Sequence, residues 1–188
     1  MRSLFCLATA TLVSATAFQV FVFAPNKNLD GAILHAAQNG FATQLDGPST
    51  YCPLKPADSC PKVVGTLVSQ DMEAMAVEVP GGQQIYVEAD GQVKYSIPHA
   101  NNIPPDATVG GWFHKSIVSE CLGPAARDVV DFSDGKGHGG LALCPSDLSI
   151  KSLTLFAKTA GFKESNCTDI GGLNLALAKS EVGSWEYT

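Results

Sequence analysis

Turn-forming dipeptides recur along this chain between short apolar runs, and they limit the folds open to it. They are Asp30-Gly31, Asn39-Gly40, Asp46-Gly47, Asp90-Gly91 and Asp134-Gly135. Asn, Asp and Gly tolerate the positive φ angles that tight hairpins need. The pattern therefore predicts a hairpin-rich, antiparallel protein.

The strongest hairpin signal joins Gln84–Glu88 to Gln92–Ser96, because two alternating segments flank Asp90-Gly91. No segment keeps a helical apolar period over three turns, and Pro145–Leu148 could form one helical turn at most. Further strands are expected at 19–23, 31–36, 41–45, 62–68, 74–79, 111–115, 129–132, 140–144, 153–157, 173–178 and 185–187. We predict a single compact all-β domain of about a dozen short strands.

Two all-β architectures fit this strand count. Asp46-Gly47, Asp90-Gly91 and Asp134-Gly135 are each 44 residues apart, which is the kind of period that a threefold β-trefoil-like barrel would show. Little else repeats at that offset, so coincidence is a serious alternative. A two-sheet β-sandwich remains open.

The first seventeen residues have the layout of a secretory signal peptide. Arg2 is followed by a short apolar core at 4–13 and by the small-residue site Ala15-Thr16-Ala17. We expect cleavage before Phe18, with residues 1–17 as the signal and residues 18–188 as the secreted all-β domain. The apolar run continues to Ala24, so a membrane anchor is the rival interpretation. It is disfavoured because the core is short and the continuation is β-branched and aromatic, like a strand.

Five cysteines remain when Cys6 leaves with the signal, and an oxidising compartment favours their pairing. Five cysteines allow several maps. We favour Cys52–Cys60, which are close in sequence and each followed by proline, and then Cys144–Cys167. Cys121 would be left over, as a buried inert thiol or as an intermolecular partner.

Charge and motifs exclude several functions. The chain has 18 acidic against 12 basic residues and no basic cluster, so no nucleic-acid partner is expected, nor any membrane contact after cleavage. The glycine run at 135–140 precedes a strand-like segment rather than a helix, so it does not match a phosphate-binding loop. Asp131, Asp134 and His138 have loose spacing for a metal site. We expect no metal and no cofactor.

No catalytic group stands out. A Gly-x-Ser-x-Gly elbow is absent, and no pair is favoured among the acidic residues Glu73, Glu78, Glu88, Asp90 and Asp106. The chain is therefore expected not to be an enzyme. Aromatic side chains could instead stack on sugars, with Tyr86, Tyr95, Trp112 and Trp185 as candidate ligand-binding residues, although core packing is the alternative for most. Asn166-Cys167-Thr168 is an N-glycosylation sequon centred on a cysteine.

Several segments together resemble one family of small secreted proteins. The most specific are Val77-Glu78-Val79-Pro80-Gly81-Gly82-Gln83-Gln84 and the terminal Trp185-Glu186-Tyr187-Thr188, with 49–53, 60–61 and 143–145 in support. This set is similar to the secreted IgE-binding and phialide-associated cell-wall proteins of ascomycete fungi. The resemblance implies an extracellular or cell-wall location, possible allergenicity, and no transferable catalytic residues.

The leading hypothesis is thus a non-enzymatic, secreted or cell-wall-associated fungal protein that binds IgE. A carbohydrate-binding module for wall polysaccharide is the alternative, and a secreted hydrolase is third.

Overall fold

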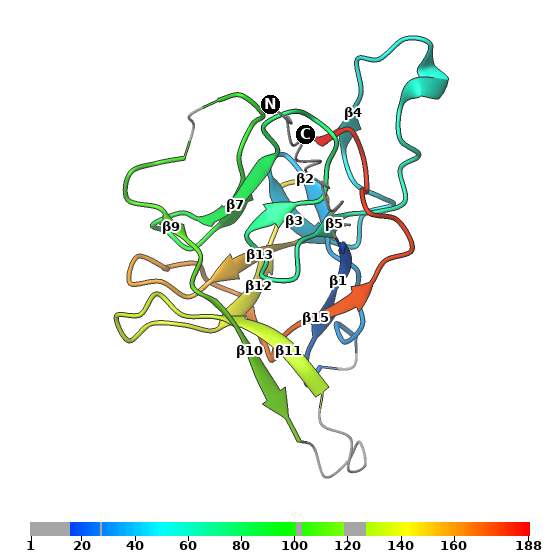
Figure 1. The fold of residues 1–188 in the computed structure, drawn as a ribbon. Coiled ribbons are helices and arrows are strands. Elements are labelled where there is room, and N and C mark those ends of the chain that lie inside the picture. The colour runs from blue at the N-terminus through cyan, green and yellow to red at the C-terminus, as the bar shows by residue number, and fades with distance from the viewer. Residues whose placement is uncertain (1–15, 27, 101–102, 119–126) are drawn as a thin grey trace, which may run out of the picture.

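The structure is a computed structural model that describes residues 16–26, 28–100, 103–118 and 127–188. Fourteen strands form one curled antiparallel sheet, and two more form a small separate sheet (Figure 1). The described residues contain no α-helix, only the single 3₁₀ turn η1 (Ala57–Ser59). Nor do they contain a helix with the length and apolarity needed to cross a bilayer. The all-β prediction is confirmed, and the helical turn expected at 145–148 does not form.

One part of the sheet is a barrel-like layer. Its hydrogen-bonded order runs β10-β11-β15-β1-β5-β6, and it is open between β6 and β10. The six strands are β1 (Phe18–Phe23), β5 (Leu67–Val68), β6 (Ala74–Met75), β10 (Trp112–Ile117), β11 (Arg127–Phe132) and β15 (Gly172–Leu177). β1 lies at its centre, paired over its full length with β15 and at its start with β5.

The other part is a cap of three hairpins. They are β2 (His35–Ala37) with β3 (Gly40–Thr43), β7 (Gln83–Val87) with β8 (Val93–Tyr95), and β12 (Leu141–Pro145) with β13 (Leu153–Ala157). Each hairpin contacts the other two, because β3 pairs with both β13 and β8, and Gln92 of the second hairpin bridges to Phe156 of the third. The cap is therefore a closed triangle of hairpins.

Six barrel strands and three capping hairpins make a trefoil-like arrangement rather than a sandwich. The sheet is continuous from barrel to cap, since β6 pairs with β7. The 44-residue spacing that suggested this fold is nevertheless not a structural repeat. Asp46-Gly47 follows the first hairpin, Asp90-Gly91 lies inside the turn of the second, and Asp134-Gly135 lies between β11 and β12.

Alternation along the strands creates the core. On β1, Val20 and Val22 are buried while their neighbours are partly exposed, as expected for a strand with one face inward. Ile85, Tyr95 and Phe132 join them in one continuous cluster that spans barrel and cap. Tyr95 packs edge-on against Phe41, with ring centroids 5.6 Å apart.

The C-terminal segment is locked into this core. β16 (Glu186–Tyr187) pairs with β4 (Thr50–Tyr51) beside the chain end (Figure 1). The Gln83 amide donates to the Tyr187 carbonyl (2.9 Å) and accepts from the Tyr187 N–H (2.8 Å). The Tyr187 hydroxyl accepts from the Leu67 N–H (2.9 Å) and donates to the Gly65 carbonyl (2.7 Å). Tyr187 thus ties the last strand to the barrel.

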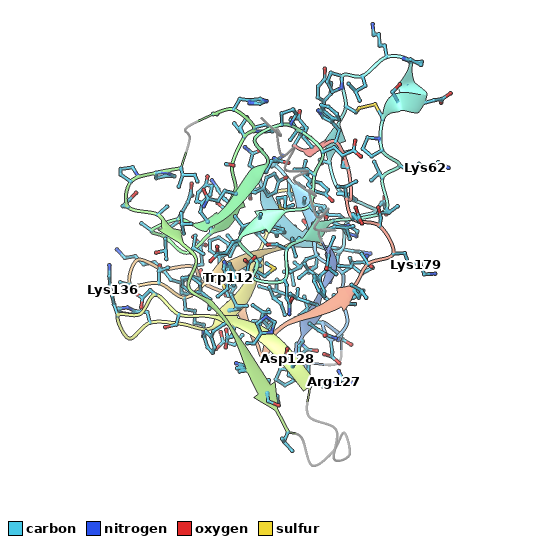
Figure 2. All side chains as sticks on the ribbon, viewed as in Figure 1. Lys62, Trp112, Arg127, Asp128, Lys136 and Lys179 are labelled. Atoms are coloured by element: carbon cyan, nitrogen blue, oxygen red, sulfur yellow. A yellow bond between two sulfur atoms is a disulfide. The ribbon has the colours of Figure 1, made fainter. Side chains whose placement is uncertain are left out.

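The described part of the chain contains two disulfides, and they are the two that the sequence favours. Cys52–Cys60 closes a loop that projects from the body and carries η1, while Cys144–Cys167 lies at the cap (Figures 1 and 2). Cys121 and most of the expected signal peptide fall outside the described residues.

Candidate functional site

A polar hollow of about 240 Å³ lies where the three hairpins of the cap meet. We call it the cap hollow. Each hairpin contributes to it, together with the segment 158–167 that joins β13 to β14 (Thr168–Ile170), which we call the strap. The lining residues are Ala37, Gln38, Gly40, Phe41, Gln92, Pro145, Ser146, Asp147, Leu148, Thr154, Phe156 and Glu164. The cap hollow is thus built from residues far apart in sequence.

Local backbone geometry positions the two glutamines of the cap hollow, Gln38 and Gln92. Gln38 and Asn39 form the turn of the first hairpin with φ of 49° and 57°, the signature of a type I′ turn. The sequence predicted Asn39-Gly40 at this turn, but Gly40 already lies in β3. Gln92 follows Gly91, whose φ is +97° and where a Cβ would lie 2.2 Å from the Ala157 carbonyl oxygen. Only glycine permits this approach of the second hairpin to the third.

The lining chemistry is mixed. Gln38 and Gln92 offer both hydrogen-bond donors and acceptors, while Asp147 and Glu164 offer acceptors only. Phe156, 8% exposed, is an apolar part of the lining. Asp147 and Glu164 are exposed, and within the described ranges neither makes an ion pair or a side-chain hydrogen bond. The cap hollow therefore presents unused polar groups around a small apolar surface.

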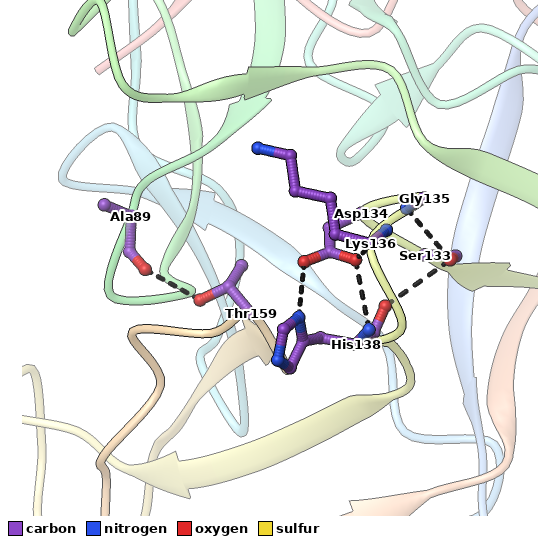
Figure 3. Close-up of polar contacts among 7 residues, drawn as sticks. All are labelled: Ala89, Ser133, Asp134, Gly135, Lys136, His138 and Thr159. Atoms are coloured by element: carbon purple, nitrogen blue, oxygen red, sulfur yellow. Dashed lines mark hydrogen bonds and ion pairs between the residues drawn. The ribbon is translucent and has the colours of Figure 1, made fainter.

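The strap is held by contacts at both ends. The Thr159 hydroxyl donates to the Ala89 carbonyl at 2.7 Å (Figure 3). Phe162 packs on Phe156 with ring centroids 6.0 Å apart. Beyond Phe162, Cys167 is bonded to Cys144, and these residues form a small apolar cluster separate from the main core. Glu164 lies between these two attachments.

The aromatic residues expected to bind ligand do not gather at one place. Tyr86 and Tyr95 are 3% and 0% exposed, so their role as surface ligand contacts is wrong. Tyr95 occupies an inward position of β8 and belongs to the main core, whereas Tyr86 lies on the other face of β7 from Ile85 and is buried outside that core. Burial raises the pKa of both phenols. Trp112 and Trp185 are partly buried, and neither lines the cap hollow.

Trp112 lines a second hollow, of about 300 Å³, at the open side of the barrel. Here the His114 ring crosses the gap. Its Nδ1 lies 2.8 Å from Asp128 Oδ2, and its Nε2 lies 3.3 Å from the Gln70 carbonyl oxygen. The Trp112 indole packs edge-on against Phe132, and its Nε1 is buried without a hydrogen-bond partner in the described part of the chain. This hollow is a gap in the barrel wall that a side chain bridges.

The acidic turn after β11 is held by hydrogen bonds among its own residues (Figure 3). Asp134 accepts from the N–H groups of Lys136 (2.7 Å) and His138 (3.1 Å), and its second oxygen meets His138 Nδ1 at 2.8 Å. Partial desolvation would raise the pKa of Asp134, but these hydrogen bonds lower it. Asp131 instead pairs with Lys115. No group of three potential metal ligands occurs in the described residues.

Positive charge is dispersed over the surface. Lys136 lies on the left of the outline, Arg127 in its lower part, and Lys62 and Lys179 on the right (Figure 2).

Comparison with known proteins gives one informative likeness. A protein of the fungus Arthroderma benhamiae, described as an uncharacterized secreted protein, is 31% identical over 168 residues, which is 86% of this chain and 80% of the relative. This chain belongs to the same family as that secreted fungal protein. No family model matches the chain, and no solved structure matches it.

Membership of this family agrees with the signal-peptide pattern and with the two disulfides. Together they support an extracellular location. Asp147 and Glu164 are the functional candidates that reasoning from sequence missed. No local motif marks them, because they come together only when the cap folds.

Proposed function

We propose that this chain is a non-enzymatic extracellular protein of the fungal cell wall and that it binds a wall polysaccharide through the cap hollow. The observation that carries the proposal is the lining of that hollow. Two side-chain amides and two unpaired carboxylates surround a phenyl ring in a space smaller than the roughly 300–1,000 Å³ of drug-sized pockets. A sugar ring is small, has hydroxyls on its rim and apolar C–H faces, and so matches both parts of the lining.

Hydrogen-bond chemistry supports a neutral polyhydroxylated ligand. Each sugar hydroxyl both donates and accepts, and Gln38 and Gln92 can do the same in return. Asp147 and Glu164 accept bonds strongly because charged acceptors roughly double hydrogen-bond strength. The hollow's lining contains no cation, so it disfavours acidic glycans.

Exposure of the two carboxylates favours binding over hydrolysis. A glycosidase needs one carboxyl kept protonated by a desolvated environment and a second one ionised opposite to it. Asp147 and Glu164 are both open to solvent. We therefore assign them to ligand contact and not to acid–base catalysis.

The test is binding to insoluble chitin and β-glucan, followed by titration with soluble oligosaccharides. We expect D147N and E164Q each to weaken binding about tenfold, since a hydrogen bond to a charged group contributes about 1.5–3 kcal/mol. D58N and D106N are matched controls, because each removes an exposed carboxylate that does not line the hollow. Equal binding by all four variants, or no binding by the wild type, would refute the assignment.

IgE binding follows from the family resemblance and is a separate part of the proposal. An immunoassay with sera from fungus-sensitised donors tests it. Uniformly negative sera would remove it without affecting polysaccharide binding.

A further inference from the structure

The contacts of the strap point to a role for Cys144–Cys167 beyond stabilising the fold. We propose that this disulfide and the Phe156–Phe162 contact together are a positioning device that holds Glu164 at the rim of the cap hollow. The inference rests on the proposed polysaccharide site and explains how one of its walls is built.

The first observation is that the strap has no sheet partner of its own. It follows β13 directly and ends where β14 begins. Its tip, residues 163–166, is exposed throughout. Nothing in the tip contributes to the main core, so the tip takes its position from its attachments.

The second observation is where those attachments lie. Phe162 is two residues before Glu164, and Cys167 is three residues after it. Phe162 packs on Phe156, which itself lines the hollow, and Cys167 is bonded to Cys144 next to Pro145, another lining residue. Both anchors therefore connect the strap to β12 and β13 at residues that line the same hollow or adjoin its lining.

The third observation is that the strands next to this bridge are paired without it. β12 is paired with β13 over five residues and with β14 over three, independently of the sulfur atoms. Cys144, 1% exposed, belongs with Ala142 and Phe156 to the small satellite cluster and not to the main core. Loss of the bridge should free the tip while the strands remain paired.

A matched pair of disulfide variants tests the device. C144A/C167A should bind the oligosaccharide that the wild type binds at least tenfold more weakly. C52A/C60A, which opens the projecting loop instead, should bind as the wild type does. F162A should reproduce the loss with both disulfides intact, so that cysteine chemistry itself is excluded as the cause.

Two further readouts separate positioning from general destabilisation. NMR order parameters of the backbone amides 163–166 should fall below about 0.6 in C144A/C167A, while those of β1 and β15 stay at their wild-type values. Adding E164Q to C144A/C167A should weaken binding no further, because residues acting through one contact are not additive.

The outcomes are distinct. Unchanged order parameters in the tip would overturn the positioning role even if no polysaccharide binds. Lowered order parameters with undiminished binding by C144A/C167A would also overturn it. Failure of the wild type to bind any wall polysaccharide, with the order parameters lowered as expected, would refute the proposed function and leave the device as a purely structural one.

Discussion

Replacing Tyr187 by phenylalanine tests how the C-terminal segment is held. The change removes one oxygen that accepts from the buried Leu67 N–H and donates to the Gly65 carbonyl. Leaving a buried donor unpaired costs about 1–3 kcal/mol. Because Gly65 is partly exposed, its carbonyl can accept a hydrogen bond from water instead. We therefore expect a loss of about 2 kcal/mol in the free energy of unfolding. For a domain of this size that is about 4–8 °C in Tm.

The same variant has a second signature at alkaline pH. Burial raises the pKa of Tyr187 from 10.0 to about 12. The folded state therefore favours the neutral phenol, and the unfolded chain loses its proton first. Stability should fall as pH rises from about 10 to about 12, by at most about 1.4 kcal/mol per pH unit from this one tyrosine.

Urea denaturation at pH 7 and at several values above pH 10 measures both effects. The wild type should lose stability more steeply above pH 10 than Tyr187→Phe, although Tyr95 continues to contribute in both because burial also raises its pKa. Tyr51→Phe is the control, since Tyr51 is 54% exposed on the partner strand β4. A loss under 0.5 kcal/mol at pH 7, or equal alkaline slopes, would refute the reasoning.

Three more predictions concern packing and processing. Gly183→Ala should destabilise the fold by about 3 kcal/mol or prevent secretion, because the new Cβ would lie 1.9 Å from the Tyr187 hydroxyl oxygen. Gly47→Ala should be neutral, because a Cβ there would meet nothing within 4 Å. Comparing the melting temperatures of the two variants checks this. N-terminal sequencing and alkylation of the secreted protein should find Phe18 first and Cys121 as the one free thiol, and a retained leader or more than one alkylated cysteine would contradict us. Digestion with an endoglycosidase should lower the mass if Asn166, which is exposed, carries a glycan, and an unchanged mass would show that the sequon is unused.

Much of the strand layout could be predicted from local sequence. Alternation and turn chemistry predict the hairpin around Asp90-Gly91, and β7 and β8 form it. The prediction succeeds because both signals are local. The two-residue strand at Thr50–Tyr51 and the strand at Thr168–Ile170 were not expected. Each depends on a distant partner, Glu186–Tyr187 in one case and Leu141–Leu143 in the other, and carries no alternation of its own.

The candidate site was less predictable for the same reason. Tyr86 and Tyr95 were selected for their chemistry, but alternation on β8 turns the Tyr95 ring into the main core. Tyr86 lies on the opposite face of β7 from Ile85 and is still only 3% exposed, which alternation alone does not predict. Asp147 and Glu164 have no neighbouring motif, and only the triangle of hairpins and the strap bring them to one hollow. Sequence periodicity reports which residues are inside, and it cannot report which surface residues from separate loops share a cavity.

The most direct test of this account is an NMR titration of the uniformly labelled protein with chitin and β-glucan oligosaccharides. We predict concentration-dependent shifts of the amides around Gln38, Gln92, Asp147 and Glu164, with the barrel residues around His114 unaffected. Shifts confined to the barrel opening, or none with any wall oligosaccharide, would contradict the assignment of the cap hollow as the binding site.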